Sequence, residues 1–393
     1  MLVGDAPWVP TGYGVQNKML SKGIRAMGHE ISMLATSGIC GSTITYDGMK
    51  CFPNSEAYYS QDVQALWADK INADIMLTVV DAWVLNPANY KSKAKWVAYY
   101  PVDSSPIPGA VAEKVRMSWE SATFTRFGQK EAEKEGLRSE YIPNSVDTMT
   151  YKPVPTHEAR AKTGLPMDAY IVGMVAMNRG DRKGFPQIIE GFSKFAKKKK
   201  DAYLYLHTMV GDQGEHNVIN LKNLVDHYGL QNRVIFPNRF DYVACGFSDA
   251  MMANLYSSMD VLCSPTRGEG FGVPVVEAQA CGTPVIVGDW TAMSETCKVG
   301  IKIDVKDSIR EYTFLNSFNY IAKPEAIASA LKEMSNVRKE SLSEDCVNGI
   351  KEYDINYVLT HNWLPFLQKI EKRLEEEGDG SKNLQNFLWE GLK

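Results

Sequence analysis

Short apolar runs alternate with amphipathic stretches along most of the chain, which is the pattern of parallel strands joined by helices. Each run is short enough for a buried strand and is bounded by polar or turn-forming residues. The runs that predict strands are 31–34, 75–80, 96–100, 122–125 and 140–142 in the first half, and 170–176, 203–207, 234–236, 261–264 and 285–287 in the second.

The amphipathic stretches predict helices between these strands and at the end of the chain. They cover 16–27, which Gly28 closes, 186–199, 218–228, 250–257, 325–334 and 361–377. Segments 143–147 and 151–155 interrupt the alternation and predict a linker. We therefore predict an α/β protein with two Rossmann-like domains, 1–148 and 149–345, whose parallel sheets face a central cleft, followed by C-terminal helices 346–393.

Composition is that of an ordinary globular protein, with 44% hydrophobic and 23% charged residues in 393. A net charge of −4 gives no general attraction to nucleic acid or anionic membrane. Seven widely spaced cysteines without a Cys-x-x-Cys predict reduced thiols and no structural zinc. The sequence shows neither a membrane-spanning apolar run nor a signal-peptide layout, so we expect a cytoplasmic protein. Because the chain opens abruptly, either its first strand is short or its start is assigned late.

The most informative segment is 267–287, which contains two glutamates separated by seven residues. Glu269 lies in a glycine-rich loop, and Glu277 lies in a predicted helix that Pro274 opens and Gly282 ends. A glycine-rich loop at a helix N-terminus is an anion site. Two carboxylates beside such a site need other partners, and sugar hydroxyls are suitable donors. A phosphate with a polyol indicates a nucleotide sugar.

This segment resembles the signature of glycosyltransferase family 4, the retaining enzymes of GT-B fold. The resemblance implies that Glu269 binds the hydroxyls of the transferred sugar and Glu277 binds the ribose. It also implies donor contacts from the four residues that directly follow Glu269, which are Gly270, Phe271, Gly272 and Val273. The alternative is that Glu269 is a solvated loop carboxylate and that Glu277 only compensates a helix dipole.

A basic turn at 178–184 directly follows a predicted strand and resembles the family segment in which an Arg and a Lys hold the donor diphosphate. Lys183, followed by Gly184, matches the Lys position. The Arg position falls on Asn178, so Arg179 or Arg182 must supply the second charge, and Arg179 is preferred. The alternative is a basic surface turn.

Three further segments complete the candidate site. Gly12, Tyr13 and Gly14 resemble the family's N-terminal glycine loop, which meets the donor phosphate from the other domain, although a plain turn explains them equally well. Asp103 follows a strand and either orients the acceptor or caps a turn. Asn144 replaces a family histidine, which weakens any transfer of its role.

The resemblance, which extends to phage and archaeal members, implies metal-independent transfer of a sugar from a UDP- or GDP-linked donor to an acceptor hydroxyl, with retention and without a cofactor. It also implies that domain 1–148 binds the acceptor, that domain 149–345 binds the nucleotide sugar, and that helices 346–393 cross back onto the first domain. The acceptor is a saccharide, a lipid or hydroxymethylated phage DNA, and in the phage case the enzyme works in the host cytoplasm. The alternatives are an epimerase or hydrolase of nucleotide sugars, or a binding protein without transfer activity. Aromatic residues such as Trp8, Tyr13 and Trp83 either stack on ligands or pack in the core. The sequence disfavours a dehydrogenase because no Gly-x-Gly-x-x-Gly with a downstream acidic residue follows a strand.

Overall fold

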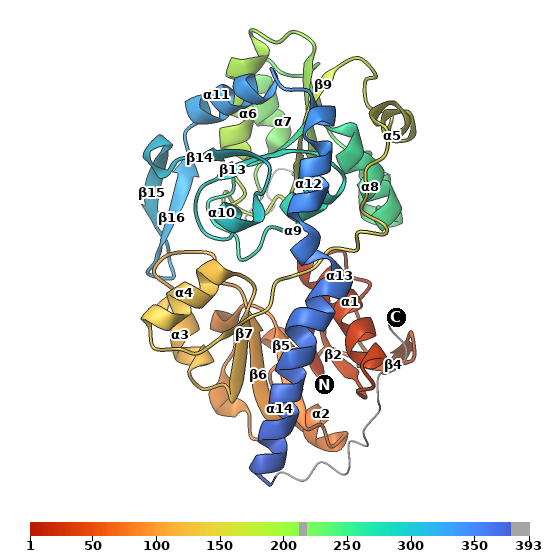
Figure 1. The fold of residues 1–393 in the computed structure, drawn as a ribbon, viewed down its shortest axis with the longest axis vertical. Helices are drawn as coiled ribbons and strands as arrows, with labels where there is room; N and C mark the ends of the chain where they lie inside the picture. The colour runs from red at the N-terminus through yellow and green to blue at the C-terminus, as the bar shows by residue number, and fades with distance from the viewer. Residues whose placement is uncertain (212–217, 379–393) are drawn as a thin grey trace. The chain divides into compact units, whose positions relative to one another are not determined.

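An eight-stranded sheet organises the first part of the chain (Figure 1). The structure is a computed structural model that describes residues 1–211 and 218–378. Neighbouring strands are parallel except for β3 and β4, and the order is β3-β4-β2-β1-β5-β6-β7-β8. The strands are β1 (Leu2–Asp5), β2 (Ser32–Ser37), β3 (Ile44–Tyr46), β4 (Met49–Phe52), β5 (Ile75–Val79), β6 (Lys95–Tyr100), β7 (Glu120–Thr123) and β8 (Glu140–Tyr141).

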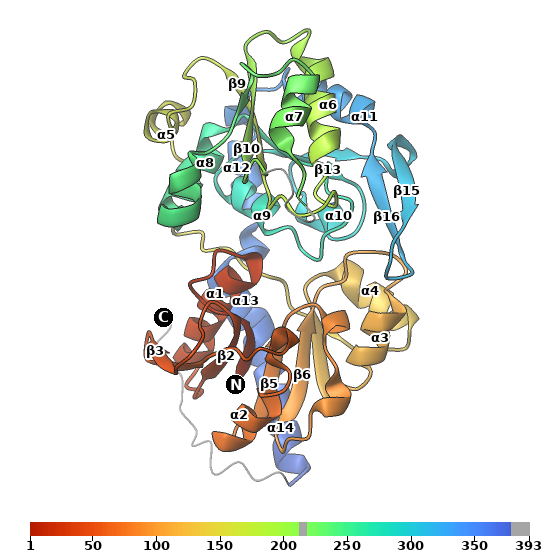
Figure 2. The same ribbon diagram turned by 180° about the vertical axis from the view of Figure 1, so that it is seen from behind.

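Helices cover this sheet, and the C-terminal helix α14 runs along one face of it in Figures 1 and 2. Arg373 of α14 donates to the carbonyl oxygen of Trp119 at 2.7 Å and to the Glu120 carboxylate at 2.6 Å. The helices are α1 (Gly12–Ala26), α2 (Gln64–Lys70), α3 (Gly109–Val115), α4 (Arg126–Lys134), α13 (Ile355–Val358) and α14 (Leu364–Glu376). Single turns lie at Tyr58–Ser60, Ala82–Val84 and Pro87–Asn89, and a π-helical turn lies at Leu359–Trp363.

A second sheet has six parallel strands in the order β11-β10-β9-β12-β13-β14 (Figure 2). A separate antiparallel hairpin, β15–β16, follows it. The strands are β9 (Tyr170–Val175), β10 (Ala202–His207), β11 (Val234–Ile235), β12 (Val261–Ser264), β13 (Val285–Gly288), β14 (Gly300–Ile303), β15 (Ser308–Tyr312) and β16 (Phe318–Ala322).

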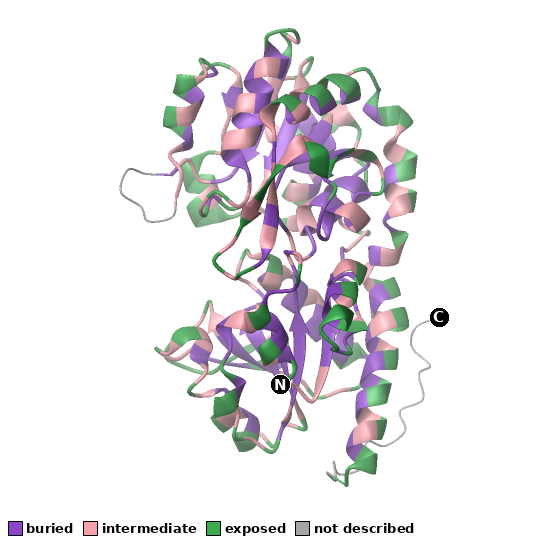
Figure 3. Cartoon of the chain, turned by 90° about the vertical axis from the view of Figure 1, so that its left-hand side faces the viewer, coloured by how far each residue is buried: buried purple, intermediate pink, exposed green. Residues whose placement is uncertain are grey.

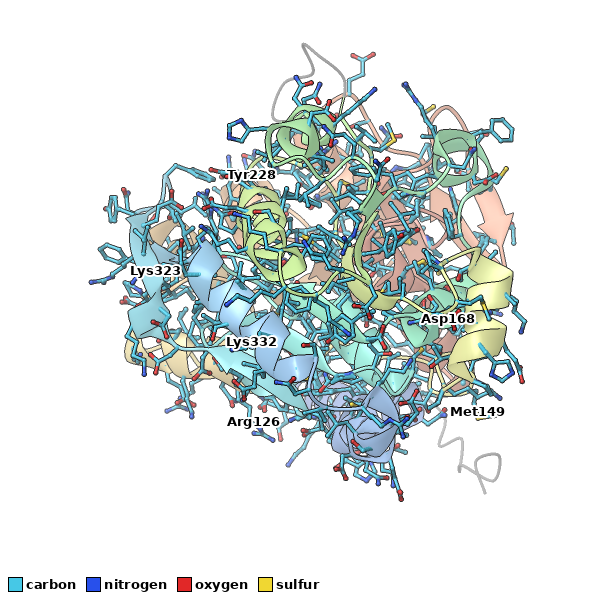
Figure 4. The ribbon with its side chains drawn as sticks, turned by 90° about the horizontal axis from the view of Figure 1, so that it is seen from above. Arg126, Met149, Asp168, Tyr228, Lys323 and Lys332 are labelled. Atoms are coloured by element: carbon cyan, nitrogen blue, oxygen red, sulfur yellow. The ribbon has the colours of Figure 1, made fainter. Side chains whose placement is uncertain are left out.

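Amphipathic helices close the core of the second sheet. Helix α6 packs against α11, and its Phe185, Ile188, Ile189 and Phe192 are completely buried. Figure 3 shows that buried residues follow the strands, whereas exposed residues lie on the outer sides of helices. Lys332 lies on the exposed side of α11 (Figure 4). The helices are α5 (Thr156–Thr163), α6 (Phe185–Ala196), α7 (Leu221–His227), α8 (Asp249–Ser258), α9 (Val273–Ala280), α10 (Met293–Thr296), α11 (Pro324–Met334) and α12 (Ser343–Gly349), with short turns at Asp241–Cys245, Val305–Asp307, Lys339–Ser341 and Lys351–Tyr353.

The chain divides into two units by its contacts. Unit 1 consists of Met1–Val102, Ile107–Ser145 and the segment from Ile355, and unit 2 consists of Asp103–Pro106 and Val146–Asp354. The boundary at Ser145 lies within the segment predicted as a linker. Part of the predicted C-terminal region 346–393, residues 379–393, lies outside the described residues.

The predicted strands are all present, with ends shifted by a few residues. The first strand, β1, has four residues. Helix α1 begins at Gly12 rather than at residue 16, because Thr11 caps it: its side chain accepts the N–H of Gly14 at 3.0 Å. No described helix is long and apolar enough to cross a membrane.

Candidate active site

Two loops of unit 2 bring a cation and a carboxylate together. One follows β9 and carries Lys183, and the other follows β12 and carries Glu269; β9 and β12 are adjacent parallel strands. The carboxyl ends of adjacent parallel strands meet at one edge of a sheet. Lys183 Nζ lies 2.5 Å from Glu269 Oε1, and Arg182 Nη1 lies 3.5 Å from Oε2.

The two loops are also joined by hydrogen bonds to main-chain atoms and approach each other closely at Gly184. The N–H of Arg267 donates to the carbonyl oxygen of Arg182 at 2.8 Å, and Arg182 Nη1 donates to the carbonyl oxygen of Gly268 at 2.7 Å. A Cβ on Gly184, which has φ +79°, would clash with the carbonyl oxygen of Pro265. Glycine is therefore required at position 184 for the loop of Lys183 to reach the loop of Glu269.

The charge state of Glu269 follows from these neighbours. Burial raises the pKa of the carboxyl group, but the attraction of Lys183 and Arg182 is stronger and lowers the pKa to about 2. Burial lowers the pKa of the Lys183 ammonium, and Glu269 opposes that shift. Glu269 is thus an ionised carboxylate whose charge two cations neutralise.

Glu277 lies in a different environment, on the buried side of α9. Tyr256 of α8 donates its hydroxyl to Glu277 Oε2 at 2.6 Å. Burial raises the pKa of Glu277 to about 7, although hydrogen bonds from Tyr256 and Tyr151 act in the opposite direction. Glu277 therefore titrates near neutral pH, whereas Glu269 stays ionised.

The residues between the glutamates contribute mainly backbone. Gly272 has φ +86° and caps α9, whose first residues are Val273 and Pro274. The Phe271 ring is buried against Tyr353 at a centroid distance of 5.4 Å, so it is a packing residue. In the first turn of α9, Pro274 has no N–H and the N–H of Val275 donates to the carbonyl oxygen of Gly272 at 2.9 Å, and Gly270 precedes this turn.

The structure separates the two candidate arginines. Arg182 lies beside Glu269, whereas Arg179 is exposed and forms no ion pair with any residue that the structure describes. Asn178, at the family's Arg position, is buried, and its amide donates to the carbonyl oxygens of Met209 and Ile219 at 3.2 and 2.7 Å. Asn178 therefore anchors the start of the basic turn to the segment after β10.

Arg267 is a buried residue that sequence reasoning did not single out. Its guanidinium lies 2.7 Å from Glu311 of β15 and 2.6 Å from Asp181 of the basic turn. Its position inside the glutamate motif could have marked Arg267 as a site residue. Its partners could not be predicted, because they are 44 and 86 residues away in sequence. Arg267 connects the basic turn, the Glu269 loop and the β15–β16 hairpin.

The remaining candidates lie on other segments of the chain. Asp103 is part of unit 2, where its carboxylate lies 3.8 Å from Arg182 Nη1. Gly12, Tyr13 and Gly14 form the first turn of α1 in unit 1. Gly14 is buried, and a Cβ there would clash with the carbonyl oxygen of Val9, so close packing requires glycine at this position.

A hollow lies next to the basic turn at the carboxyl ends of β10 and β11. The hydroxyl of Thr208 accepts the N–H of Asn178 at 3.0 Å, which connects the hollow to the turn. Its lining residues are Thr208, Met209, Val210, Gly211, Pro237, Arg239 and Tyr242. Among the described residues, no three His, Cys, Asp or Glu side chains gather so that they could hold a metal ion.

Solved structures share this fold. Sucrose-phosphate synthase from Thermosynechococcus elongatus has a TM-score of 0.74 at 16% identity, with 94% of this chain and 96% of that chain covered. Anabaena HepE in complex with UDP and glucose has a TM-score of 0.68 at 16% identity, with 95% and 99% covered. The fold of the chain is GT-B.

Sequence comparison identifies the class of unit 2. A family model described as Glycosyl transferases group 1 matches residues 155–302, which contain Lys183, Glu269 and Glu277. Mannosylfructose-phosphate synthase of Agrobacterium fabrum is 35% identical over 121 residues, 30% of this chain and 24% of that protein. D-inositol 3-phosphate glycosyltransferase of Mycobacterium tuberculosis is 30% identical over 150 residues, 38% and 28% of the two chains. The chain thus spans about a quarter of the length of these relatives, and the matches support a glycosyltransferase.

The two glutamates should affect stability with opposite dependence on pH. The folded-state pKa of Glu269 is lowered from 4.5 to about 2, so its stabilising effect is complete above pH 4.5 and is lost as the pH falls towards 2. Chemical denaturation at several pH values should show that the difference in unfolding free energy between wild type and Glu269→Gln shrinks over this window, by up to about 3 kcal/mol.

Glu277→Gln is the matched control. Its folded-state pKa is raised from 4.5 to about 7, so wild type should lose stability relative to this variant as the pH rises between these values. The same pH dependence for both variants would contradict the assigned charge states.

Proposed function

We propose that this chain is a retaining glycosyltransferase that moves a sugar from a UDP- or GDP-linked donor to an acceptor hydroxyl without a metal ion. The observation that carries the proposal is the contact between Lys183 and Glu269, on loops from adjacent strands, with Glu277 on the helix that follows Glu269. Cations for a diphosphate and carboxylates for hydroxyl groups thus lie in one part of unit 2.

Each part of the donor has a candidate partner in this arrangement. Lys183 and Arg182 bind the diphosphate, Glu269 the sugar hydroxyls and Glu277 the ribose hydroxyls. The nucleobase occupies the hollow beside Thr208, because that hollow adjoins the basic turn. Complexes of HepE with UDP and with UDP-glucose make UDP the first nucleotide to test.

The reaction needs no covalent intermediate with the protein. The bond between the anomeric carbon and the diphosphate oxygen breaks, and the acceptor oxygen bonds to the same carbon on the same face. The acceptor proton passes to the departing diphosphate oxygen. Lys183 and Arg182 stabilise the negative charge that develops on the diphosphate, as preorganised cations do in a partly dehydrated site.

A donor panel tests the proposal as a whole. The protein is incubated with UDP- and GDP-sugars, mixed acceptors and EDTA, and the products are separated by mass. Transfer of the sugar supports the proposal, whereas release of free sugar alone indicates a hydrolase. Failure to bind either UDP or GDP in calorimetry would overturn it.

Neutralising Glu269 should strengthen binding of UDP while it impairs transfer. In the ligand-free protein the Glu269 carboxylate neutralises Lys183 and Arg182, so the diphosphate must compete with it. Glu269→Gln should lower the Kd of UDP several-fold, most strongly at low salt, and should sharply reduce the transfer rate. Weaker UDP binding in a folded variant would contradict this role.

Binding of UDP should depend on the ionisation of Glu277. Its pKa of about 7 means that a ribose hydroxyl gains its charged acceptor only as the pH rises through this value. Calorimetry from pH 6 to pH 8 should therefore show a growing loss of affinity in Glu277→Gln relative to wild type, reaching about 1.5–3 kcal/mol. The ionisation of UDP itself affects both proteins equally, and a constant ratio of their Kd values would exclude the contact.

The basic turn should contain one essential lysine and one important arginine. Lys183→Ala should lower turnover by roughly 10²-fold, as loss of an oxyanion-type donor does. Arg182→Ala should approach this effect, because Arg182 already lies beside Glu269, and exposed Arg179→Ala serves as the matched control. A larger loss for Arg179→Ala would show that the turn rearranges when the donor binds.

A further inference from the structure

Four neighbouring loops at one edge of the unit 1 sheet contain no lysine or arginine. They are residues 6–11, 38–43, 53–63 and 80–90, and they follow β1, β2, β4 and β5. These strands are parallel neighbours, so their carboxyl ends share an edge of the sheet. The loops and the strand end carry the acidic residues Asp5, Glu56, Asp62 and Asp81.

Aromatic rings gather on the same loops. Trp8 donates its indole N–H to the carbonyl oxygen of Gly38 at 2.8 Å, and its ring lies 5.1 Å from that of Tyr46. The rings of Tyr58 and Tyr59 stand nearly perpendicular, with centroids 4.6 Å apart. Tyr58 is 65% exposed, so its ring is accessible to a ligand.

Contacts between the loops bring the rings and carboxylates together. The amide of Gln61, next to the two tyrosines, donates to the carbonyl oxygen of Val84 at 3.0 Å, which joins the third loop to the fourth. Burial raises the pKa of Tyr59, and Tyr58, Asp81 and Asp5 add to this shift. The edge is therefore aromatic and acidic.

This chemistry suits a neutral polyol and opposes an anion. Phosphate groups are usually bound by Arg, Lys or helix N-termini. The loop 6–11 leads into the N-terminus of α1, and there the side chain of Thr11 already accepts the N–H of Gly14. Saccharides present apolar ring faces that stack on aromatic rings, and hydroxyl groups that donate to carboxylates.

We infer that this edge of unit 1 binds an uncharged saccharide as the acceptor, with Tyr58 and Trp8 as the stacking rings. The inference rests on the proposed function, because only a transferase needs an acceptor. It separates this chain from relatives whose names contain a phosphorylated sugar or inositol, and it argues against DNA, whose phosphates the carboxylates would repel.

A printed array of neutral, phosphorylated and sialylated glycans tests the inference with the full chain, with and without UDP. A gel shift with hydroxymethylated duplex DNA at low salt accompanies it. We expect binding to neutral glycans and none to phosphorylated glycans or DNA. Tyr58→Ala and Trp8→Ala should each weaken glycan binding roughly three- to tenfold. Tyr357→Ala is the matched control, because Tyr357 is a 42% exposed tyrosine on α13, outside these loops.

The outcomes distinguish this inference from the proposed function. UDP binding that is intact in Tyr58→Ala, with glycan binding weakened, supports the inference. Selective binding of phosphorylated glycans or DNA, or neutral-glycan binding that Tyr58→Ala and Trp8→Ala leave unchanged, would overturn it while the donor site stands. Failure of UDP and GDP to bind would instead remove the proposed function.

Discussion

The ion pair between Lys183 and Glu269 is the interaction on which the rest of the candidate site depends. A buried carboxylate is costly unless a cation lies close to it, and a buried ammonium has the same requirement. The two groups lie on loops 86 residues apart in sequence, so the fold must bring these loops into van der Waals contact. Adjacent strands β9 and β12 provide the common edge, and Gly184 allows the final approach.

Arg267 connects the loops of this ion pair to the β15–β16 hairpin. Its charge is balanced by Asp181 and Glu311, so the basic turn, the glutamate loop and β15 are joined by one buried guanidinium. Its N–H also donates to Arg182, and its carbonyl oxygen accepts the N–H of Tyr320. Removing one partner of such a group leaves an uncompensated buried charge, so the Arg267 ion pairs stabilise the observed arrangement of these loops.

Much of this could be predicted from the sequence, because strands of unit 2 are continuous apolar runs and the glutamate motif is local. Strand β12 has the predicted bounds, and Glu277 lies on a helix as expected. The hairpin β15–β16 was missed because Ile309 and Tyr312 are exposed, so its pattern does not mark a buried face. The choice between Arg179 and Arg182 depends on how Asn178 anchors the turn to residues 31 and 41 positions away, which no local pattern reveals.

In the proposed function, donor binding and acceptor binding differ in how clearly the sequence reveals them. A nucleoside diphosphate requires particular charges at particular distances, so its candidate partners form a motif, and that motif lies within the matched residues 155–302. An acceptor hydroxyl requires only a compatible surface, which many loop sequences provide. The loops of unit 1 lie outside the matched segment. Their binding chemistry is inferred from their aromatic and acidic residues and from the absence of lysine and arginine in them. Motifs thus indicate the proposed donor side of this protein, whereas its proposed acceptor side is inferred from the charge and aromatic content of one sheet edge.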